Sequence, residues 1–355
     1  MIFKKRRKKK ILFYIAFPMN YAILKPIHLR LKEDGRLDIS FVLRFKEKRT
    51  TRSRYQFSEL KDEKVISKRL AKLKKWDMQI CADFGFRSRK VASNVFLFHG
   101  ISFRNPTVLK DICRFEKVFV VGNYMMRKII SDGLIPAGDS RLTLVGWPKL
   151  DALVNGLFQR DEVLSRLKLH PGRQTVLYAP SHTIYSSLYT MGEEVIETVK
   201  QMGLNLIIKL HDLLYDPTRN PVNWQERLSK HEAGGVAVVR DYDVCPYLVA
   251  SDILISDASS VANEFALLDR PIVFVDCPDL IEAYRKTVDL ETWGRKIGYT
   301  VRDSKELAAA LRRAIEMPQE HSTIRTAAAQ DIFYMPGKAT ERAVREIYTL
   351  LGIDF

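Results

Sequence analysis

The stretch Asp252-Ile253-Leu254-Ile255-Ser256-Asp257-Ala258-Ser259-Ser260-Val261-Ala262-Asn263-Glu264-Phe265 decides how the chain is interpreted. It opens with a short apolar run typical of a buried strand and continues with apolar residues at helical spacing. Four polar residues occupy the turn between the two: Ser256, Asp257, Ser259 and Ser260. The free N–H groups at the start of a helix can bind an anion there, and the same pattern also fits a plain helix cap without a ligand.

The whole chain is long enough to bury a sizeable core. It has 355 residues, 46% of them hydrophobic, and this length favours two domains over one. No apolar run approaches the roughly 20 residues needed to span a bilayer. The four cysteines are far apart and form no C-x-x-C pair, which argues against a zinc site and against a disulfide scaffold. Reduced thiols in a cytoplasmic protein are the simplest interpretation.

The net charge of +16 is concentrated in the N-terminal quarter. Residues 1–90 contain 27 Lys and Arg against 9 Asp and Glu, whereas the rest of the chain contains 31 against 33. Lys4–Lys10 is an unbroken basic run, and the short apolar segment after it has no small-residue cleavage site, which argues against export. The cluster predicts an anionic membrane surface as partner, at about 1 kcal/mol per basic side chain. No nucleic-acid module is recognisable, and a solvated tail is the alternative.

Strand-like and helix-like segments alternate along the chain, which predicts an α/β protein with mostly parallel sheets. A basic tail (1–10) precedes a first Rossmann-like domain (11–168). A second Rossmann-like domain (172–335) is followed by a C-terminal helix (336–355) that crosses back to the first. The expected helices include Ser58–Lys75, Asp151–Lys168 and one capped by Ser304. The result is a twin-Rossmann arrangement with a cleft between the doubly wound domains.

Several motifs are missing from the chain. It has no G-x-G-x-x-G and no G-x-x-x-x-G-K-[ST], so a Rossmann dehydrogenase and a P-loop NTPase lose support. It also has no H-E-x-x-H and no carboxylate cluster that suggests a metal. The sequence therefore predicts chemistry without a metal or another cofactor.

Polar residues follow several predicted strands, where ligands of open α/β sheets bind. His99 follows an apolar run in the first half, and His211 follows one in the second. A lone histidine at such a place is often a structural hydrogen-bonding group, but two that face one cleft suggest function. An imidazole titrates near neutral pH, so either histidine could take up or donate a proton. The helix after Asp257 would add N–H groups that can bind an anion.

Five short motifs occur in an order that resembles the CDP-glycerol glycerophosphotransferase family, the teichoic-acid-type polyol phosphate transferases. They are Phe98-His99-Gly100, Gly146-Trp147-Pro148-Lys149-Leu150-Asp151, Tyr178-Ala179-Pro180-Ser181-His182, Ile208-Lys209-Leu210-His211 and Ile255-Ser256-Asp257-Ala258-Ser259-Ser260-Val261. The resemblance implies a GT-B-like fold and transfer of glycerol phosphate or ribitol phosphate from a CDP-activated donor. It further implies a lipid-linked saccharide or polymer as acceptor, a role in cell-surface polymer biosynthesis, and peripheral attachment to the inner face of the membrane.

The resemblance also implies roles for individual residues. His99 is the candidate general base, and His211 lies near the donor pyrophosphate, which Ser256, Asp257, Ser259 and Ser260 would bind. Weaker candidates for the phosphates are Arg104 and Lys209, and for the nucleotide Glu264, Ser181 and His182. Two positions depart from the family pattern: Asp212 replaces the usual proline after the second histidine, and Ile101-Ser102-Phe103-Arg104 replaces T-P-x-K.

Two other functions use the same scaffold. One is a GT-B glycosyltransferase or sugar-nucleotide 2-epimerase that acts on a UDP-sugar. The other is a non-catalytic subunit that binds the membrane surface.

Overall fold

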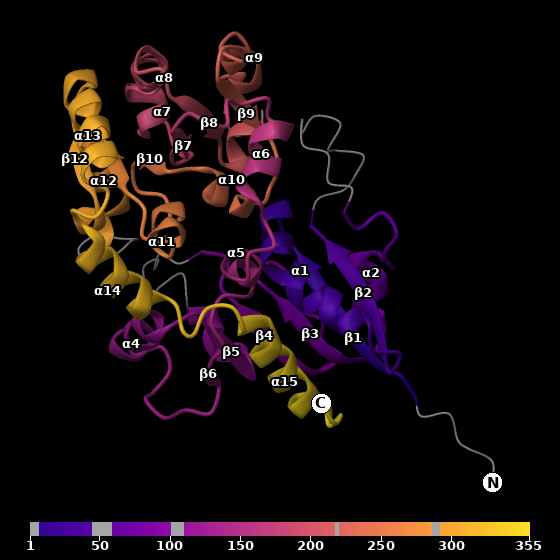
Figure 1. The fold of residues 1–355 in the computed structure, drawn as a ribbon. Helices are drawn as coiled ribbons and strands as arrows, with labels where there is room; N and C mark the ends of the chain where they lie inside the picture. The colour runs from indigo at the N-terminus through magenta and orange to yellow at the C-terminus, as the bar shows by residue number, and fades with distance from the viewer. Residues whose placement is uncertain (1–6, 45–58, 101–109, 217–219, 286–291) are drawn as a thin grey trace.

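The computed structural model describes residues 7–44, 59–100, 110–216, 220–285 and 292–355. These residues form two halves, each built around a six-stranded parallel sheet with helices packed against it (Figure 1). The first half lies at the bottom of Figure 1 and the second at the top, with the C-terminal helices running down from one to the other.

The first sheet is made of β1 (Lys9–Ile15), β2 (Leu37–Leu43), β3 (Trp76–Cys81), β4 (Val91–Leu97), β5 (Lys117–Val120) and β6 (Leu142–Leu144). Its strand order is β2-β1-β3-β4-β5-β6, and all neighbouring pairs are parallel. The inner strand β1 is buried over Ile11–Ile15, as expected for a strand covered on both faces. Because β1 starts at Lys9, the basic tail ends before the expected residue 10.

The second sheet is made of β7 (Thr175–Tyr178), β8 (Asn205–Lys209), β9 (Val236–Val239), β10 (Ile253–Ser256), β11 (Ile272–Val275) and β12 (Tyr299–Val301). Its order is β12-β11-β10-β7-β8-β9, again parallel throughout. Alternate side chains of β7 enter different cores: Val176 and Tyr178 pack in one with Val195 and Leu311, whereas Leu177 joins a core that continues into the first half. The two halves therefore share apolar packing.

The helices of the described residues are α1 (Pro18–Lys32), α2 (Lys68–Leu73), α4 (Asn123–Ser131), α5 (Asp151–Val154), α6 (Arg160–Arg166), α7 (Ser187–Thr190), α8 (Gly192–Gln201), α9 (Trp224–Ser229), α10 (Cys245–Ala250), α11 (Val261–Ala266), α12 (Pro278–Tyr284), α13 (Ser304–Glu316), α14 (Ser322–Ile332) and α15 (Ala339–Leu351). Short 3-10 turns include η3 (Pro148–Leu150) and η4 (Asp212–Tyr215). Within the described ranges, every helix is too short or too polar to cross a bilayer.

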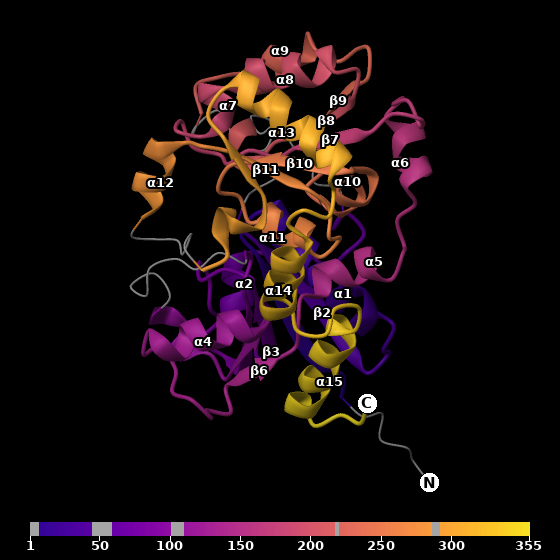
Figure 2. The same ribbon diagram turned by 60° about the vertical axis from the view of Figure 1, so that its left-hand side comes forward.

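The chain returns to the first half through α14 and α15, which Figure 2 shows one below the other. α14 contacts α11 of the second half and α4 of the first, where Arg127 forms an ion pair with Asp331 at 2.6 Å. α15 packs on α1, and Tyr348 donates to Asp34 at 2.8 Å. The crossing thus begins with α14, earlier than the C-terminal helix that the sequence suggests.

The motif Gly146–Asp151 lies where this crossing meets the end of the first sheet. Gly146 has φ +89, and a side chain there would place its Cβ 2.6 Å from the Tyr334 carbonyl oxygen, so only glycine fits. Asp151 is buried and accepts hydrogen bonds from Ala339 N at 3.0 Å and Thr340 N at 2.6 Å. Asp151 therefore caps α15 from a distant part of the chain.

Replacing this cap should measurably weaken the fold. We expect Asp151→Ala to lower the free energy of unfolding by about 1–2 kcal/mol, because two N–H groups at the start of α15 lose their acceptor. Urea-induced unfolding measures the change. Asp161→Ala, at an exposed position of α6, is the matched control and should change stability by less than about 0.5 kcal/mol. Equal effects of the two substitutions would rule out the capping role.

Three helix predictions are wrong in part. The expected helix Ser58–Lys75 is reduced to α2. Phe41 N donates to Lys64 O and Ile66 N donates to Phe41 O, so the backbone at Val65 forms a parallel bridge beside β2 instead. Ser58 itself lies outside the described residues. The expected helix Asp151–Lys168 is divided into α5 and α6 by a turn at Gly156, where φ is +71. The cap of α13 is Asp303, whose side chain accepts from two N–H groups, and not Ser304.

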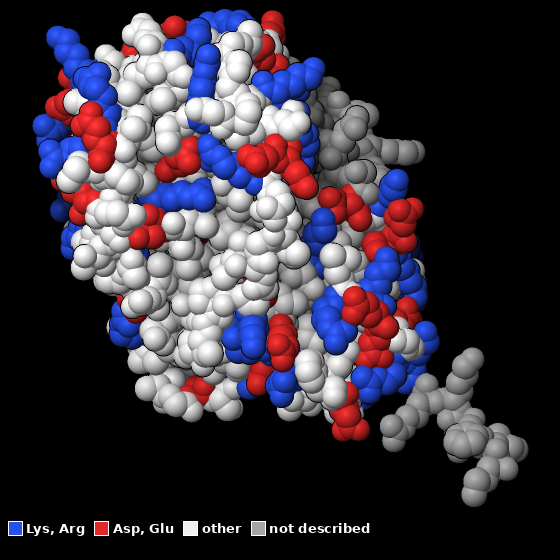
Figure 3. All heavy atoms as spheres, in the orientation of Figure 1, with Lys and Arg blue, Asp and Glu red and all other residues white. Residues whose placement is uncertain are grey.

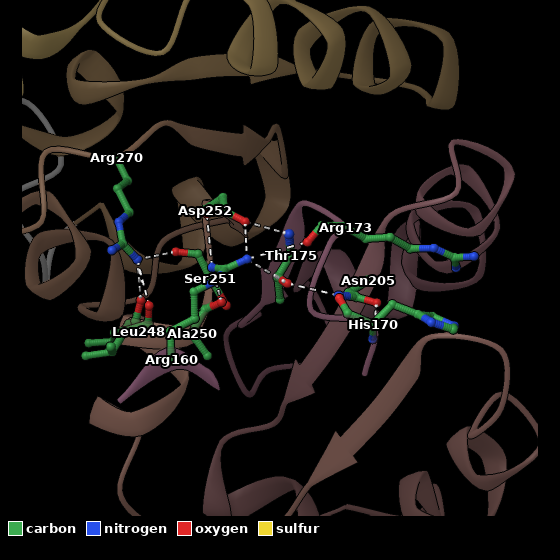
Figure 4. Close-up of polar contacts among 11 residues, drawn as sticks. Arg160, His170, Arg173, Thr175, Asn205, Leu248, Ala250, Ser251, Asp252 and Arg270 are labelled. Carbon is green, nitrogen blue, oxygen red and sulfur yellow. Dashed lines mark hydrogen bonds and ion pairs between the residues drawn. The ribbon is translucent and has the colours of Figure 1, made fainter. Parts of the chain in front are cut away.

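The amino ends of β7, β8 and β10 are tied together by the polar network of Figure 4. Arg160 of α6 forms two hydrogen bonds with Asp252, at 2.8 and 3.0 Å, and Asp252 accepts a third from Thr175 N at 2.8 Å. Arg270 donates to the carbonyl oxygens of Val249 and Ser251 at the end of α10. This network fixes the amino-terminal edge of the second sheet, so the carboxyl-terminal edge is the one left for binding.

Candidate active site

A cavity of about 100 Å³ lies at the carboxyl ends of both sheets, and both halves line it. The first half contributes Met19, Ala22, Ile23, His99 and Lys149. The second half contributes a set that includes Lys209, His211, Asp212, Ser259, Ser260 and Glu264. The structure therefore brings His99, His211, Lys209, Ser259, Ser260 and Glu264 together, six of the candidates named from the sequence.

His99 is held by the strand next to its own. Its Nδ1 lies 2.7 Å from the carbonyl oxygen of Ala82, which follows β3. A carbonyl oxygen only accepts, so Nδ1 carries the proton in the neutral ring and Nε2 carries the lone pair. This tautomer, inferred from the hydrogen bond, suits a general base.

His211 has the opposite tautomer. Its Nδ1 accepts a hydrogen bond from Leu213 N at 3.1 Å at the start of η4, so Nε2 carries the proton in the neutral ring. The ring of His182, from the loop after β7, lies against it with centroids 4.5 Å apart. His211 is therefore oriented as a hydrogen-bond donor, and His182 supports it from one side.

The serines of residues 256–260, the serine turn, have two different roles. Ser259 and Ser260 line the cavity, and Ser259 Oγ accepts from Val261 N at 3.4 Å. Ser256 is fully buried and donates to Ala179 O at 2.8 Å, which joins the ends of β10 and β7. The helix that follows, α11, has six residues, so its dipole is short, and Ser260 makes no side-chain cap bond among the described residues. The two serine hydroxyls and the adjacent N–H groups are what this turn offers an anion.

Asp257 is buried and supports the loop after β7. It is 1% exposed, and its two carboxylate oxygens accept from the backbone and hydroxyl groups of Ser181 and Ser187 and from Ala258 N. The oxygens of this buried carboxylate are occupied by protein donors, and its negative charge would repel a pyrophosphate. We therefore revise the expectation that Asp257 binds the pyrophosphate and that Ser181 binds the nucleotide: both hold the wall of the cavity.

A buried ion pair joins the two halves at the cavity. Lys149 of η3 donates to both carboxylate oxygens of Glu264 in α11, at 2.7 and 2.9 Å, and the side chains are 12% and 4% exposed. Burial opposes the charge of Lys149, but Glu264 and Asp243 outweigh it and raise the pKa of Lys149. The sequence motif Gly146–Asp151 pointed to this region, but Lys149 was missed as a site residue because its partner lies in the other half.

A second charged pair lies deeper in the second half. Lys209 Nζ donates to the Leu210 carbonyl oxygen at 2.8 Å and lies 3.7 Å from Asp212 Oδ1. Burial lowers the pKa of Lys209, which Asp212 partly offsets, and burial raises the pKa of Asp212, which Lys209 partly offsets. Lys209 thus adds positive charge to the cavity next to His211.

Arg104 lies outside the described residues. Within the described part of the chain, no group of three or more His, Cys, Asp or Glu side chains is placed to hold a metal ion.

Two parallel sheets whose carboxyl ends meet at a shared cavity define a two-domain α/β protein of the GT-B-like class, as predicted from the sequence. The chain belongs to the CDP-glycerol:poly(glycerophosphate) glycerophosphotransferase family, whose sequence model matches residues 48–349. The resemblance drawn from the five motifs is thereby confirmed.

Curated relatives match about half of the chain. It is 31% identical over 186 residues to a teichoic acid glycerol-phosphate primase of Bacillus spizizenii and 28% identical over 174 residues to that of Bacillus subtilis. The matches cover 50% and 46% of this chain, but 45% and 42% of those proteins, so the chain spans less than half the length of these relatives.

Solved structures share the fold over nearly the whole chain. The wall teichoic acid polymerase TagF superposes with a TM-score of 0.72 at 16% identity, covering 96% of this chain and 89% of the other. A UDP-GlcNAc 2-epimerase from Neisseria meningitidis superposes with a TM-score of 0.64 at 14% identity, covering 96% and 100%. At these identities the likeness concerns the fold alone.

Proposed function

We propose that the chain transfers glycerol phosphate or ribitol phosphate from a CDP-activated donor to a hydroxyl group of a lipid-linked saccharide or polymer. The acceptor oxygen attacks the phosphorus next to the polyol, a new P–O bond forms, and the bond to the bridging oxygen breaks to release CMP. The observation that carries this proposal is the placement of His99 and His211, with opposite tautomers, at one cavity lined by both halves.

Each group at the cavity fits one part of this reaction. Nε2 of His99 takes the proton of the acceptor hydroxyl. Nε2–H of His211 and the hydroxyls of Ser259 and Ser260 donate to the pyrophosphate oxygens, where negative charge develops as CMP leaves. Lys209 and Lys149 add positive potential, and we propose that these cationic and N–H groups serve in place of a metal ion.

Nucleotide release separates this proposal from its alternatives. The full chain is incubated with a lipid-linked saccharide and either CDP-glycerol or a UDP-sugar, with and without EDTA. We expect CMP release that depends on the acceptor and survives EDTA. Release of UDP would favour a glycosyltransferase or epimerase, and release of neither nucleotide would favour a binding subunit.

We also propose that the chain is peripheral on the cytoplasmic face of the membrane. The Lys4–Lys10 run supplies charge, although Lys9 and Lys10 belong to β1. α2 adds apolar contact, because Leu70 and Leu73 are exposed on a helix that also carries Lys68, Arg69 and Lys72. Stable attachment to a membrane takes two signals of this kind.

On the face seen in Figure 3, Lys and Arg are interspersed with Asp and Glu. Ion pairs such as Lys64–Asp38 balance part of the charge of the first half.

Neutralising the tail should weaken membrane binding without disturbing the sheet. We expect replacement of Lys4, Lys5, Arg6, Arg7 and Lys8 by Gln to reduce binding to anionic vesicles by at least 10-fold at low salt. The difference from the unmodified chain should shrink as salt rises, because salt screens the attraction. Sedimentation with vesicles measures it, and neutral vesicles are the control. Unchanged binding at low salt would show that the tail does not contribute to membrane binding.

A further inference from the structure

Asp212 has one carboxylate oxygen that no described protein group satisfies. The residue lines the cavity directly after His211, and its side chain is 12% exposed. Its Oδ1 faces Lys209 Nζ at 3.7 Å, too far for a hydrogen bond, and its buried Oδ2 has no hydrogen-bond partner among the described residues. A buried acceptor of this kind destabilises the fold unless a donor reaches it.

Asp257 shows what a purely structural carboxylate looks like in this fold. It also follows a strand of the second sheet, yet both of its oxygens accept from surrounding N–H and hydroxyl groups. Asp212 follows β8 at the same edge but lacks such donors around Oδ2. The difference leaves Oδ2 of Asp212 open to a donor group that the described part of the chain does not supply.

The chemistry of Asp212 limits what that partner can be. An ionised carboxylate only accepts hydrogen bonds and repels phosphate oxygens, so a phosphate group is excluded. We assign His211 to the donor pyrophosphate, so Asp212, the next residue in the chain, lies beside the groups that are attached to the pyrophosphate. In a CDP-activated polyol these are the ribose and the polyol, and both carry hydroxyl groups.

We propose that Asp212 accepts a hydrogen bond from a hydroxyl group of the donor, in the ribose or the polyol next to the pyrophosphate, and so selects hydroxylated donors. Lys209 Nζ lies 3.7 Å from Oδ1 of Asp212 in the cavity wall and favours the charged form of this carboxylate. The inference rests on the proposed function, since the donor is taken to be a CDP-activated polyol.

Binding of analogues that lack these hydroxyls tests the proposal. Isothermal titration compares CDP-glycerol, CDP-propanol without the glycerol hydroxyls, and CDP-glycerol with a 2′,3′-dideoxyribose. The unmodified chain should bind one of the two analogues roughly 10- to 100-fold more weakly than CDP-glycerol, which identifies the hydroxyl source. In Asp212→Ala, CDP-glycerol should bind as weakly as that analogue does, so the ratio of their two dissociation constants approaches 1. Asp212→Asn, which keeps the shape but not the charge, should give an intermediate ratio.

Each result bears on one claim. If Asp212→Ala bound all three ligands more weakly by the same factor, the ratio of dissociation constants would be unchanged, Asp212 would have a structural role, and the inference would be overturned. Equal affinity of the unmodified chain for all three ligands would overturn it as well. Binding of no CDP ligand by the unmodified chain would overturn the proposed function and this inference with it. Asp279→Ala, at an exposed position of α12, is the control and should leave every affinity unchanged.

Discussion

His99→Ala should abolish transfer while the donor still binds. The variant lacks Nε2, the atom that would accept the proton of the acceptor hydroxyl. Loss of a general base slows a reaction by roughly 10²- to 10⁴-fold. We propose that the donor is held mainly by the second half, so its dissociation constant should change less than about twofold. Acceptor-dependent release of CMP measures the rate, and isothermal titration with CDP-glycerol measures binding.

Matched variants make this result specific. His99→Gln keeps a polar side chain that can reach the Ala82 carbonyl oxygen, but it cannot take up a proton, so it should be as inactive as His99→Ala. His170→Ala, at an exposed position at the amino ends of the second sheet, should retain full activity. Turnover near the normal rate in His99→Ala would show that His99 is not the general base. Loss of donor binding in this variant would show instead that His99 contributes to the donor site.

Much of the fold could be predicted because parallel strands buried on both faces leave continuous apolar runs. Thr175–Tyr178 of β7 and Val236–Val239 of β9 are short runs of this kind. The errors lie where distant contacts override local pattern. Apolar spacing suggested a helix through Val65, but backbone pairing with Phe41 extends the sheet there, and a sequence pattern carries no sign of such pairing.

The candidate site could be predicted as a set of strand ends, but not as individual contacts. Histidines after strands mark the binding edge of an α/β sheet, so His99 and His211 could be found by position alone. Asp257 looked like a ligand because it lies in the serine turn, yet its oxygens are used by Ser181 and Ser187, which are 70 or more positions earlier. Lys149 was missed for the same reason: Glu264 is 115 positions away.

Breaking the Lys149–Glu264 pair should have the largest effect on stability. Both side chains are nearly buried, so Glu264→Gln leaves the ammonium group of Lys149 inside the protein without its main countercharge. We expect a loss of about 3–5 kcal/mol in the free energy of unfolding, measured in urea. Glu33→Gln, which breaks the exposed Arg30–Glu33 pair, is the control and should cost less than about 1 kcal/mol.

The double variant and the pH dependence separate charge from packing. Lys149→Met with Glu264→Leu removes both charges, so most of the lost stability should return, while transfer stays impaired because the cavity loses Lys149. In the unmodified chain the pKa of Lys149 is raised, so the pair contributes fully at neutral pH and weakens only above the usual lysine range. In Glu264→Gln burial should instead lower that pKa, so the unfolded chain binds more protons and stability should rise from pH 7 to 10. A flat profile in this variant, or a double variant no more stable than the single one, would show that packing and not charge holds the two halves together here.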